Sequence, residues 1–95
     1  MVILYFVFYK NLEGLEIKTK LRVSVWLEEH GGYLMPCEFM EVANDNNFYR
    51  IKVKALDPAG FMSTEYLEKK FLFGHPGKII GYGILKEVEI IEDSQ

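Results

Sequence analysis

The chain has little of the chemistry that most catalytic and metal sites need. It contains one cysteine, Cys37, and two histidines, His30 and His75. A lone cysteine excludes an internal disulfide and is typical of a reducing compartment, so we expect a cytoplasmic location. The spacing of these three residues matches no zinc motif, and the paired carboxylates of Glu28 and Glu29 belong to a predicted loop. We therefore expect no metal, no cofactor and no catalysis. An enzyme with a nucleophilic Cys37 is the least favoured alternative.

Long apolar segments are also missing. The longest run of apolar residues, Val2–Tyr9, is far too short to span a bilayer as a helix. It has no basic flank and no small-residue cleavage site, so it does not resemble a targeting signal. Its β-branched and aromatic residues favour a strand that is covered on both faces or lies at an interface. The formal net charge of −3 argues weakly against a chain-wide affinity for nucleic acid or for an anionic membrane.

The residues that are present indicate one all-β domain. The chain has 95 residues, of which 49% are hydrophobic and 26% charged, as in an ordinary globular protein. Seven Phe and six Tyr suit the half-buried faces of strands. We expect residues 1–95 to form a small antiparallel β-barrel or sandwich, the barrel being favoured, with at most one short helix. Residues 92–95 form an acidic tail.

A predicted hairpin near the C-terminus organises this interpretation. The apolar runs Phe71–Phe73 and Ile79–Leu85 flank a turn built from Gly74, Pro76 and Gly77, residues that suit turn backbone conformations. Gly81 and Gly83 then leave one face of the returning strand bare, which favours a tight bend or a close approach of another backbone.

Alternation predicts further strands. Leu15–Leu27 reads as one long strand, with Glu16, Lys18, Lys20, Arg22, Ser24 and Trp26 on its wet face. Residues 28–33 form a loop, an edge strand starts after Pro36 within 34–42, and residues 44–47 form a turn. Phe48–Leu56 is a strand that exposes Arg50, Lys52 and Lys54. Ser63–Lys70 is a single helical turn or a loop, or else it leads straight into the next strand. Residues 86–91 alternate again.

Three blocks of the sequence resemble the C-terminal β-barrel of the elongation factor Tu family. They are Val23–Gly32 followed by Pro36, the aromatic pair after Asn47, and the closing hairpin with Gly77-Lys78 and Gly81-Tyr82-Gly83. The blocks occur in the family's order and span about residues 18–88. The resemblance implies a free-standing translation-factor-like barrel. It also implies that Gly81, Gly83 and Lys78 lie near where the family holds the T-stem of aminoacyl-tRNA. The competing interpretation is that the two glycines only turn a barrel corner.

The chain also departs from that family. It contains no GTPase domain and no phosphate-binding loop, because Gly74–Lys78 lacks the required spacing and Ser or Thr. The segment between Tyr49 and Phe71 is short, so about two strands of the family barrel are missing or reduced. Residues 1–14 are an added strand and turn. We expect this strand to fill the gap, either in its own chain or in a dimer partner.

Binding residues are predicted from periodicity and from the resemblance. Six of the eleven basic residues fall on two wet strand faces and would form a basic platform with Trp26 if the strands were neighbours. The competing interpretation is cross-strand pairing with Glu16, Glu87 and Glu89. The candidate binding residues are Lys18, Lys20, Arg22, Trp26, Arg50, Lys52, Lys54, Lys78, Gly81 and Gly83. The expected function is a non-catalytic macromolecule-binding module. A protein partner or a homodimer through the N-terminal strand is favoured, and RNA is the alternative.

Overall fold

The computed structural model describes residues 1–11 and 15–91. The predicted turn at 12–14 and the acidic tail at 92–95 lie outside the described residues. The strands and the two 3₁₀ turns follow one another in the order β1 (Val2–Lys10), β2 (Arg22–Leu27), η1 (Glu28–His30), β3 (Met35–Asp45), β4 (Phe48–Ala55), η2 (Thr64–Tyr66), β5 (Lys70–His75) and β6 (Lys78–Ile90).

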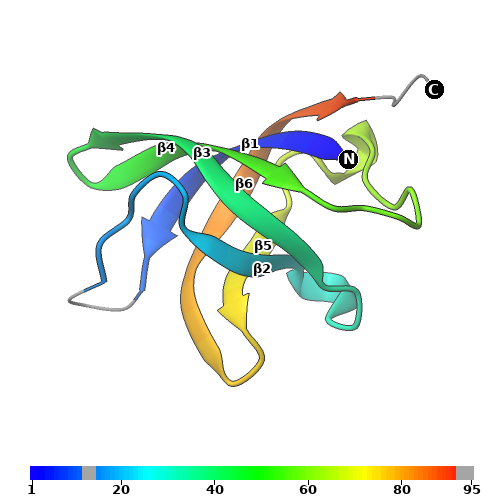
Figure 1. Cartoon of the computed structure of the whole chain (residues 1–95), viewed down its shortest axis with the longest axis horizontal. Helices are drawn as coiled ribbons and strands as arrows, with labels where there is room; N and C mark the ends of the chain where they lie inside the picture. Colours follow the sequence, from blue (N-terminus) through cyan, green and yellow to red (C-terminus); the bar gives the residue numbers. More distant parts are fainter. Residues whose placement is uncertain (12–14, 92–95) are drawn as a thin grey trace.

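The six strands close into an antiparallel barrel in the order β1-β4-β3-β2-β5-β6, with β6 returning to β1 (Figure 1). Within residues 1–11 and 15–91 there is no α-helix, only the two 3₁₀ turns. The predicted all-β barrel is therefore confirmed. Ser63 caps η2 by accepting a hydrogen bond from the N–H of Glu65, which agrees with the predicted single helical turn.

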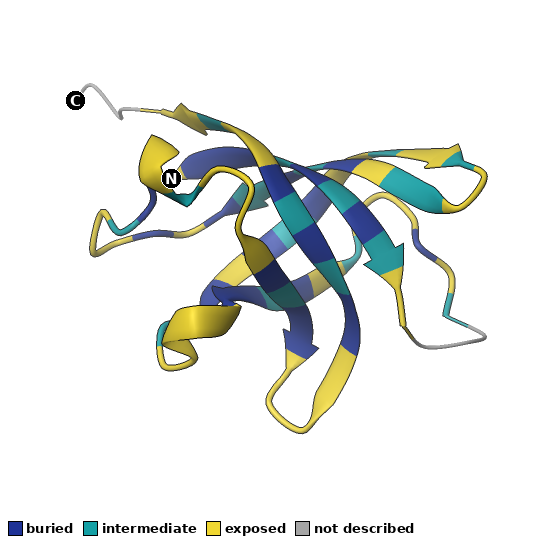
Figure 2. Ribbon diagram, turned by 180° about the vertical axis from the view of Figure 1, so that it is seen from behind, coloured by how far each residue is buried: buried dark blue, intermediate teal, exposed yellow. Residues whose placement is uncertain are grey.

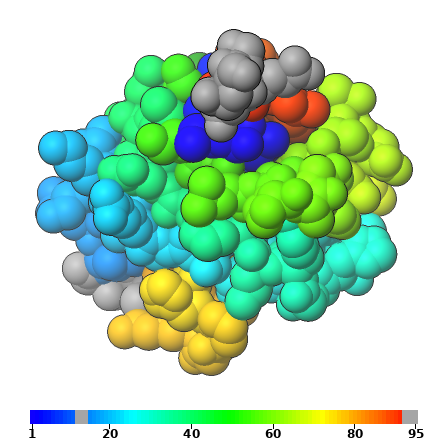
Figure 3. Space-filling model, turned by 45° about the vertical axis from the view of Figure 1, so that its right-hand side comes forward, coloured from blue at the N-terminus to red at the C-terminus, as the bar shows by residue number. Residues whose placement is uncertain are grey.

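The N-terminal strand closes the barrel within its own chain. Both edges of β1 are paired, one with β4 from Val2 opposite Ala55 and the other with β6 from Val2 opposite Ile90. The N–H of Ile91, the last described residue, donates to the carbonyl of Met1 over 3.2 Å. Figure 3 shows the beginning of the chain in blue next to the end of β6 in red at the surface. We expected the added strand to fill the gap in the barrel either in its own chain or in a dimer partner. In the structure it fills the gap in its own chain.

Aromatic rings fill the centre of the barrel. Phe6 and Phe8 of β1 meet Phe73 of β5 edge to face, with ring centroids 4.9 and 5.1 Å apart. Such pairs contribute about 0.5–1.5 kcal/mol beyond the area they bury. Gly81 and Gly83 make room for these rings, because a Cβ on Gly81 would lie 2.5 Å from the ring of Phe8. Their bare face therefore points into the core. The predicted close approach of another backbone is present at Gly81, where a Cβ would lie 2.4 Å from the carbonyl oxygen of Tyr9, whereas Gly83 is approached by the rings of Phe6 and Phe73.

The alternation predicted one long strand from Leu15 to Leu27, but the segment is not one continuous strand. Regular strand begins only at Arg22, because Lys20 adopts a left-handed conformation with φ of 70°. The apolar residues still turn inward, since Ile17 is buried in the core cluster. Backbone bonds from Lys20 N–H to the carbonyl of Phe39 and from Phe39 N–H to that of Leu21 attach the segment to β3. The pattern placed Ile17, Val23, Val25 and Leu27 inward correctly, but Thr19 is exposed, Trp26 is buried and the backbone is not one continuous strand.

The sequence predicted an edge strand that starts after Pro36 within residues 34–42. This prediction is wrong, because strand β3 is not an edge strand. It runs from Met35 to Asp45 and pairs with β2 on one side and β4 on the other. Pro36 is compatible with this position because it lies opposite the end of β4. The N–H of Leu56 donates to the carbonyl of Pro36. Proline has no N–H to donate back to Leu56, but that bond would be the last one between β3 and β4, so little pairing is lost.

Strand β6 is continuous through the two predicted segments 79–85 and 86–91. A β-bulge interrupts its pairing with β1, because Tyr5 lies opposite Glu87 and Phe6 opposite Leu85, which leaves Lys86 as the extra residue. A second irregularity leaves Met40 of β3 unpaired with β4. Bulges re-aim side chains and increase local twist. The hairpin at Pro76-Gly77 and the turn before Phe48 form where they were predicted, but both turns are shorter, because Gly74 belongs to β5 and residues 44–45 belong to β3.

Candidate functional site

The two predicted basic strand faces are not neighbours. Strand β3 lies between β2 and β4, and its outward residues include carboxylates. Glu38 lies 3.9 Å from Arg22 and opposite Lys54, and Glu41 lies 3.5 Å from Lys52. The expected basic platform is therefore absent from the described residues, because an acidic strand divides it. The competing interpretation was that these basic residues form ion pairs with carboxylates of neighbouring strands. Such ion pairs do form, but mainly with carboxylates of β3 rather than with Glu87 and Glu89.

Other predicted binding residues are dispersed. Lys18 lies 3.8 Å from its expected partner Glu16, and Lys20 sits in the left-handed turn. Trp26 is only 7% exposed, so it does not form the aromatic tip of a wet face. Lys78 is exposed at the start of β6, whereas Gly81 and Gly83 are buried beneath aromatic rings.

The outer face of the barrel carries a different feature, which we name the outer belt. Two rows of cross-strand neighbours run around β4, β1, β6 and β5. One row places Val7 between Arg50 and Ile84, with Lys70 beyond Ile84. The other row places Tyr82 between Tyr9 and Leu72. The outer belt consists of Val7, Tyr9, Phe48, Arg50, Lys70, Leu72, Tyr82 and Ile84.

Side chains in the outer belt contact one another. The rings of Tyr9 and Tyr82 stack with centroids 5.0 Å apart and planes at 22°, and Phe48 lies 6.0 Å from Tyr9. The ammonium group of Lys70 lies 4.6 Å from the centroid of Tyr82, and the guanidinium of Arg50 lies 5.9 Å from that of Phe48. These distances are within the range of cation–π attraction. The belt is thus an ordered aromatic surface with cations along it.

The belt residues are only partly covered. Figure 2 shows buried and intermediate positions alternating along the middle of β6, with exposed positions toward its ends. The intermediate positions include Tyr82 and Ile84, which point outward because Gly81, Gly83 and Leu85 point inward. Apolar side chains on the outside of a closed barrel cannot pack into its hydrophobic core. Contiguous apolar surface of this kind marks interaction sites.

Sequence reasoning missed the outer belt although its signal is present. In β1 and β6 both alternating sets are apolar, so alternation cannot tell the inner face from the outer one. The run Val2–Tyr9 was expected to be covered on both faces or to lie at an interface. The cross-strand register is what brings Tyr9, Tyr82 and Phe48 together, and register is not readable from one strand.

In the part of the chain that the structure describes, the residues with nucleophilic or ligating chemistry form no site. Cys37 is buried, and burial raises the pKa of its thiol to about 12. His30 and His75 are exposed at the ends of two different elements, η1 and β5. Among the residues that the structure describes, no group of three His, Cys, Asp or Glu side chains could hold a metal ion. No helix in the same residues is long and apolar enough to cross a membrane.

Comparison of the chain with protein-family models, curated proteins and solved structures finds no significant match.

Proposed function

We propose that the chain is a non-catalytic protein-binding module and that its contact surface is the outer belt. The observation that carries this proposal is the row of partly exposed aromatic side chains on the outside of the barrel, in which Tyr82 stacks on Tyr9 and Phe48 lies tilted against Tyr9. Tyr and Arg are enriched at the centres of protein interfaces, where they contribute most of the binding energy. The belt combines both residue types with the aliphatic side chains of Val7 and Ile84.

RNA binding is the second candidate. It is favoured by Arg50 and Lys70, which lie over belt rings as cations do on platforms that stack bases and contact phosphates. It is disfavoured by the carboxylates that already pair with these cations, Asp45 at 3.1 Å from Arg50 and Glu28 at 3.5 Å from Lys70. The acidic strand between the basic faces and the net charge of −3 also favour the protein partner.

Kinship with the C-terminal barrel of the elongation factor Tu family is part of the proposal. It is supported by the order of the three sequence blocks and by their occurrence in a closed antiparallel barrel.

A cytoplasmic location is supported by the single, buried cysteine. The absence of a catalytic role is supported by the raised pKa of Cys37, because a thiol rather than a thiolate is a poor nucleophile.

A pull-down from cell extract tests the proposal, with and without nuclease. The informative variant is Tyr82→Ala, which removes the ring that stacks on Tyr9. Its matched control is Leu34→Ala, which also removes an exposed large side chain but lies on a loop outside the belt. We expect captured proteins to be retained by the control, lost with Tyr82→Ala and insensitive to nuclease. Circular dichroism verifies that both variants are folded.

Two results would contradict the proposal. Capture that disappears with nuclease indicates the RNA alternative. Capture that Tyr82→Ala and Leu34→Ala affect equally shows that the outer belt is not the contact surface.

A further inference from the structure

The last part of β6, residues 86–90, pairs with another strand on one side only, and we name its other side the free edge. Strand β5 pairs with β6 only as far as Ile84, which lies opposite Lys70. Figure 1 shows β6 continuing, from orange to red, past the yellow strand β5. The 3₁₀ turn η2 contacts β6, but no backbone hydrogen bond joins it to residues 86–90. Among the described residues, β1 is therefore the only strand beside this part of β6.

The backbone groups that face the free edge belong to Val88 and Ile90. In an antiparallel ladder, alternate residues bond to the neighbouring strand and the residues between them point away from it. The N–H of Ile91 donates to the carbonyl of Met1, so Glu89 also bonds to β1, whereas Val88 and Ile90 point away. No backbone hydrogen bond to another described residue uses the groups of these two residues that face the free edge. Such unpaired groups are a template for a further strand.

The two faces of the sheet differ in chemistry at the free edge. The inward face carries Val88 and Ile90, which lie opposite buried residues of β1. Val88 packs against the core, whereas Ile90 is 60% exposed. The outward face carries Glu87 and Glu89, which are both exposed. The hydroxyl of Tyr5 donates to Glu89 over 3.4 Å, which leaves the charge of the carboxylate uncompensated.

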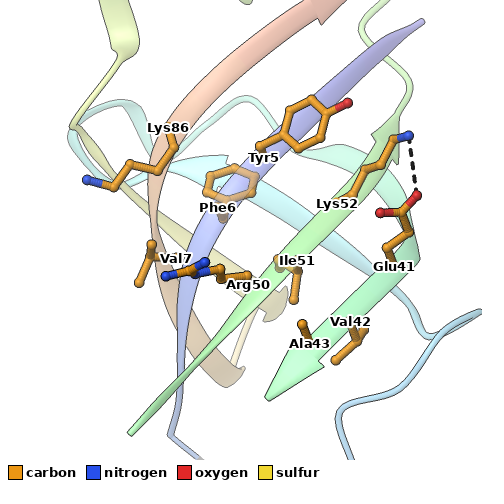
Figure 4. Close-up of a pocket in the computed structure, with 10 residues that line it drawn as sticks. All are labelled: Tyr5, Phe6, Val7, Glu41, Val42, Ala43, Arg50, Ile51, Lys52 and Lys86. Atoms are coloured by element: carbon orange, nitrogen blue, oxygen red, sulfur yellow. Dashed lines mark ion pairs between the residues drawn. The ribbon is translucent and has the colours of Figure 1, made fainter. Parts of the chain in front are cut away.

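The carboxylates of these two glutamates form no ion pair with any residue in the described part of the chain. Lys52, in the same cross-strand row as Glu87, is already 3.5 Å from Glu41 (Figure 4). Lys86 is likewise 2.9 Å from Glu68. Because opposite charges on neighbouring strands stabilise their pairing, the free edge favours a strand with cations on its outward face.

The same carboxylates argue against a second copy of the chain as the added strand. Two such edges could pair antiparallel with Val88 opposite Val88 or Ile90 of the other copy. Either register would place Glu89 opposite Glu87 or Glu89 of the other copy. Like charges directly opposite one another destabilise a pair of strands. The charge of the edge therefore selects a different chain.

We propose that the free edge of β6 binds a basic β-strand of a partner protein, which extends the sheet. The added strand bonds to the backbone of Val88 and Ile90, places Lys or Arg beside Glu87 and Glu89, and places apolar side chains against Ile90. In this mode of recognition, backbone pairing supplies affinity and the alternate side chains supply specificity. The free edge follows the part of β6 that belongs to the outer belt, so the inference does not depend on the belt.

The first test measures the binding of fluorescently labelled synthetic peptides to the whole chain by fluorescence anisotropy. The probe is a peptide of about six residues in which Lys alternates with Val, close to the usual length of a strand. One control peptide has the same composition with all Lys residues first, and another has Glu in place of Lys. We expect the alternating basic peptide to bind about tenfold or more tightly than either control.

The second test uses variants of Ile90. Ile90→Pro removes an N–H that faces the free edge and leaves the N–H groups that pair with β1. Its matched control is Ile90→Thr, which keeps both the N–H and the branched side chain. We expect the proline variant to lose about tenfold or more in affinity for the alternating peptide, and the threonine variant to keep most of it. Circular dichroism verifies that both variants are folded.

Two further measurements do not depend on the proline variant. Hydrogen exchange of the natural chain, followed by nuclear magnetic resonance, should show that the alternating peptide slows exchange at the amides of Val88 and Ile90. The amide of Glu89 is the internal control, because it already bonds to β1. The variant Glu87→Lys/Glu89→Lys should reverse the preference between the Lys and Glu peptides.

Several results would overturn the inference. These are failure of the alternating peptide to bind, equal binding of the control peptides, and unchanged exchange at Val88 and Ile90 when the peptide is bound. Slow exchange at both amides in the absence of peptide, together with dimers in light scattering, assigns the free edge to a second copy. Peptide binding that is lost with Tyr82→Ala and kept with Ile90→Pro lies on the outer belt, which overturns the inference and leaves the proposed function standing. Binding at the free edge stands even if the pull-down refutes the outer belt.

Discussion

The hydroxyl of Tyr33 donates a hydrogen bond to Oδ1 of Asp57 over 2.6 Å. The backbone N–H groups of Phe61 and Met62 donate to the same carboxylate over 2.9 and 2.8 Å. Burial opposes ionisation of Asp57, but the hydrogen bonds from Tyr33, Met62 and Phe61 outweigh it and lower the pKa of the carboxyl below its ordinary value. The carboxylate therefore holds the 57–62 loop against Tyr33 and helps to place Met62 in the core.

We expect Asp57→Ala to destabilise the chain by about 3 kcal/mol, because it leaves one buried and two part-buried donors without an acceptor. Tyr33→Phe removes only one of these donors and should cost about 1–2 kcal/mol. Urea denaturation followed by circular dichroism measures both values. Equal losses in the two variants would contradict the central role of the carboxylate.

The same carboxylate predicts a dependence of stability on pH. Because the pKa of Asp57 is lowered on folding, its contribution is present above the unfolded pKa and is lost as the pH falls through the folded pKa. The free energy of unfolding of the natural chain should therefore exceed that of Asp57→Asn by a constant amount between pH 5 and 7. The excess should shrink below about pH 4. A constant excess down to the lowest pH at which both fold would refute this.

Replacement of Gly81 by alanine should destabilise the barrel by about 2–3 kcal/mol. The added Cβ would lie 2.4 Å from the carbonyl oxygen of Tyr9, which is backbone and cannot move aside, and 2.5 Å from the ring of Phe8. Gly32→Ala is the control, because nothing lies within 4 Å of a Cβ at that position. Thermal unfolding should separate the two variants clearly. Similar midpoints would mean that the packing of Phe8 over Gly81 is loose.

The close approach at Gly81 is one of the features that the sequence alone could predict. Glycines at alternate positions of an apolar strand indicate a strand face without side chains, and a turn that contains Gly and Pro predicts a hairpin. The strand Phe48–Ala55 was equally predictable, because Ile51 and Val53 alternate with charged residues without a lapse. In these segments local propensity and the tertiary structure agree, so the pattern is sufficient.

The parts that could not be predicted depend on register and topology. The left-handed turn at Lys20 interrupts an alternation that has few lapses, and nothing in the side chain of lysine signals it. The division of the two basic faces follows from the position of β3 between them, which is a property of the closed order of strands. The outer belt arises in the same way, since Tyr9 and Tyr82 are far apart in sequence and meet only across the β1–β6 ladder.

Cys37 should resist alkylation in the folded chain. Its side chain is buried, and burial raises the pKa of its thiol to about 12, so the reactive thiolate is scarce at neutral pH. Incubation with iodoacetamide at pH 7.5, followed by mass spectrometry, should show no adduct on the native chain and one adduct in denaturant. Rapid labelling of the native chain would revive the nucleophile alternative.

Lys20→Gly should stabilise the chain by about 0.5–1 kcal/mol. A left-handed lysine costs about 1–2 kcal/mol, part of which is offset by the larger freedom of glycine in the unfolded chain. Lys18→Gly is the matched control, because Lys18 is exposed and is not among the residues with positive φ. It should destabilise by about 0.5 kcal/mol. Chemical denaturation should therefore give changes of opposite sign, and a loss of stability at both sites would contradict the assignment of strain to Lys20.

Removal of residues 1–11 should convert the chain from a closed barrel into a species that associates with itself. The deletion removes β1 together with Phe6 and Phe8 from the core, and it exposes the edges of β4 and β6 that β1 now pairs. Unpaired edges recruit other strands, so we expect oligomers by size-exclusion chromatography with light scattering. A synthetic peptide of residues 1–11 should reduce this association by restoring both ladders. The same peptide with Phe6 and Phe8 replaced by serine is the control, because it keeps the backbone pairing but not the core contacts. If residues 12–95 remain monomeric and folded, β1 is not the strand on which closure depends.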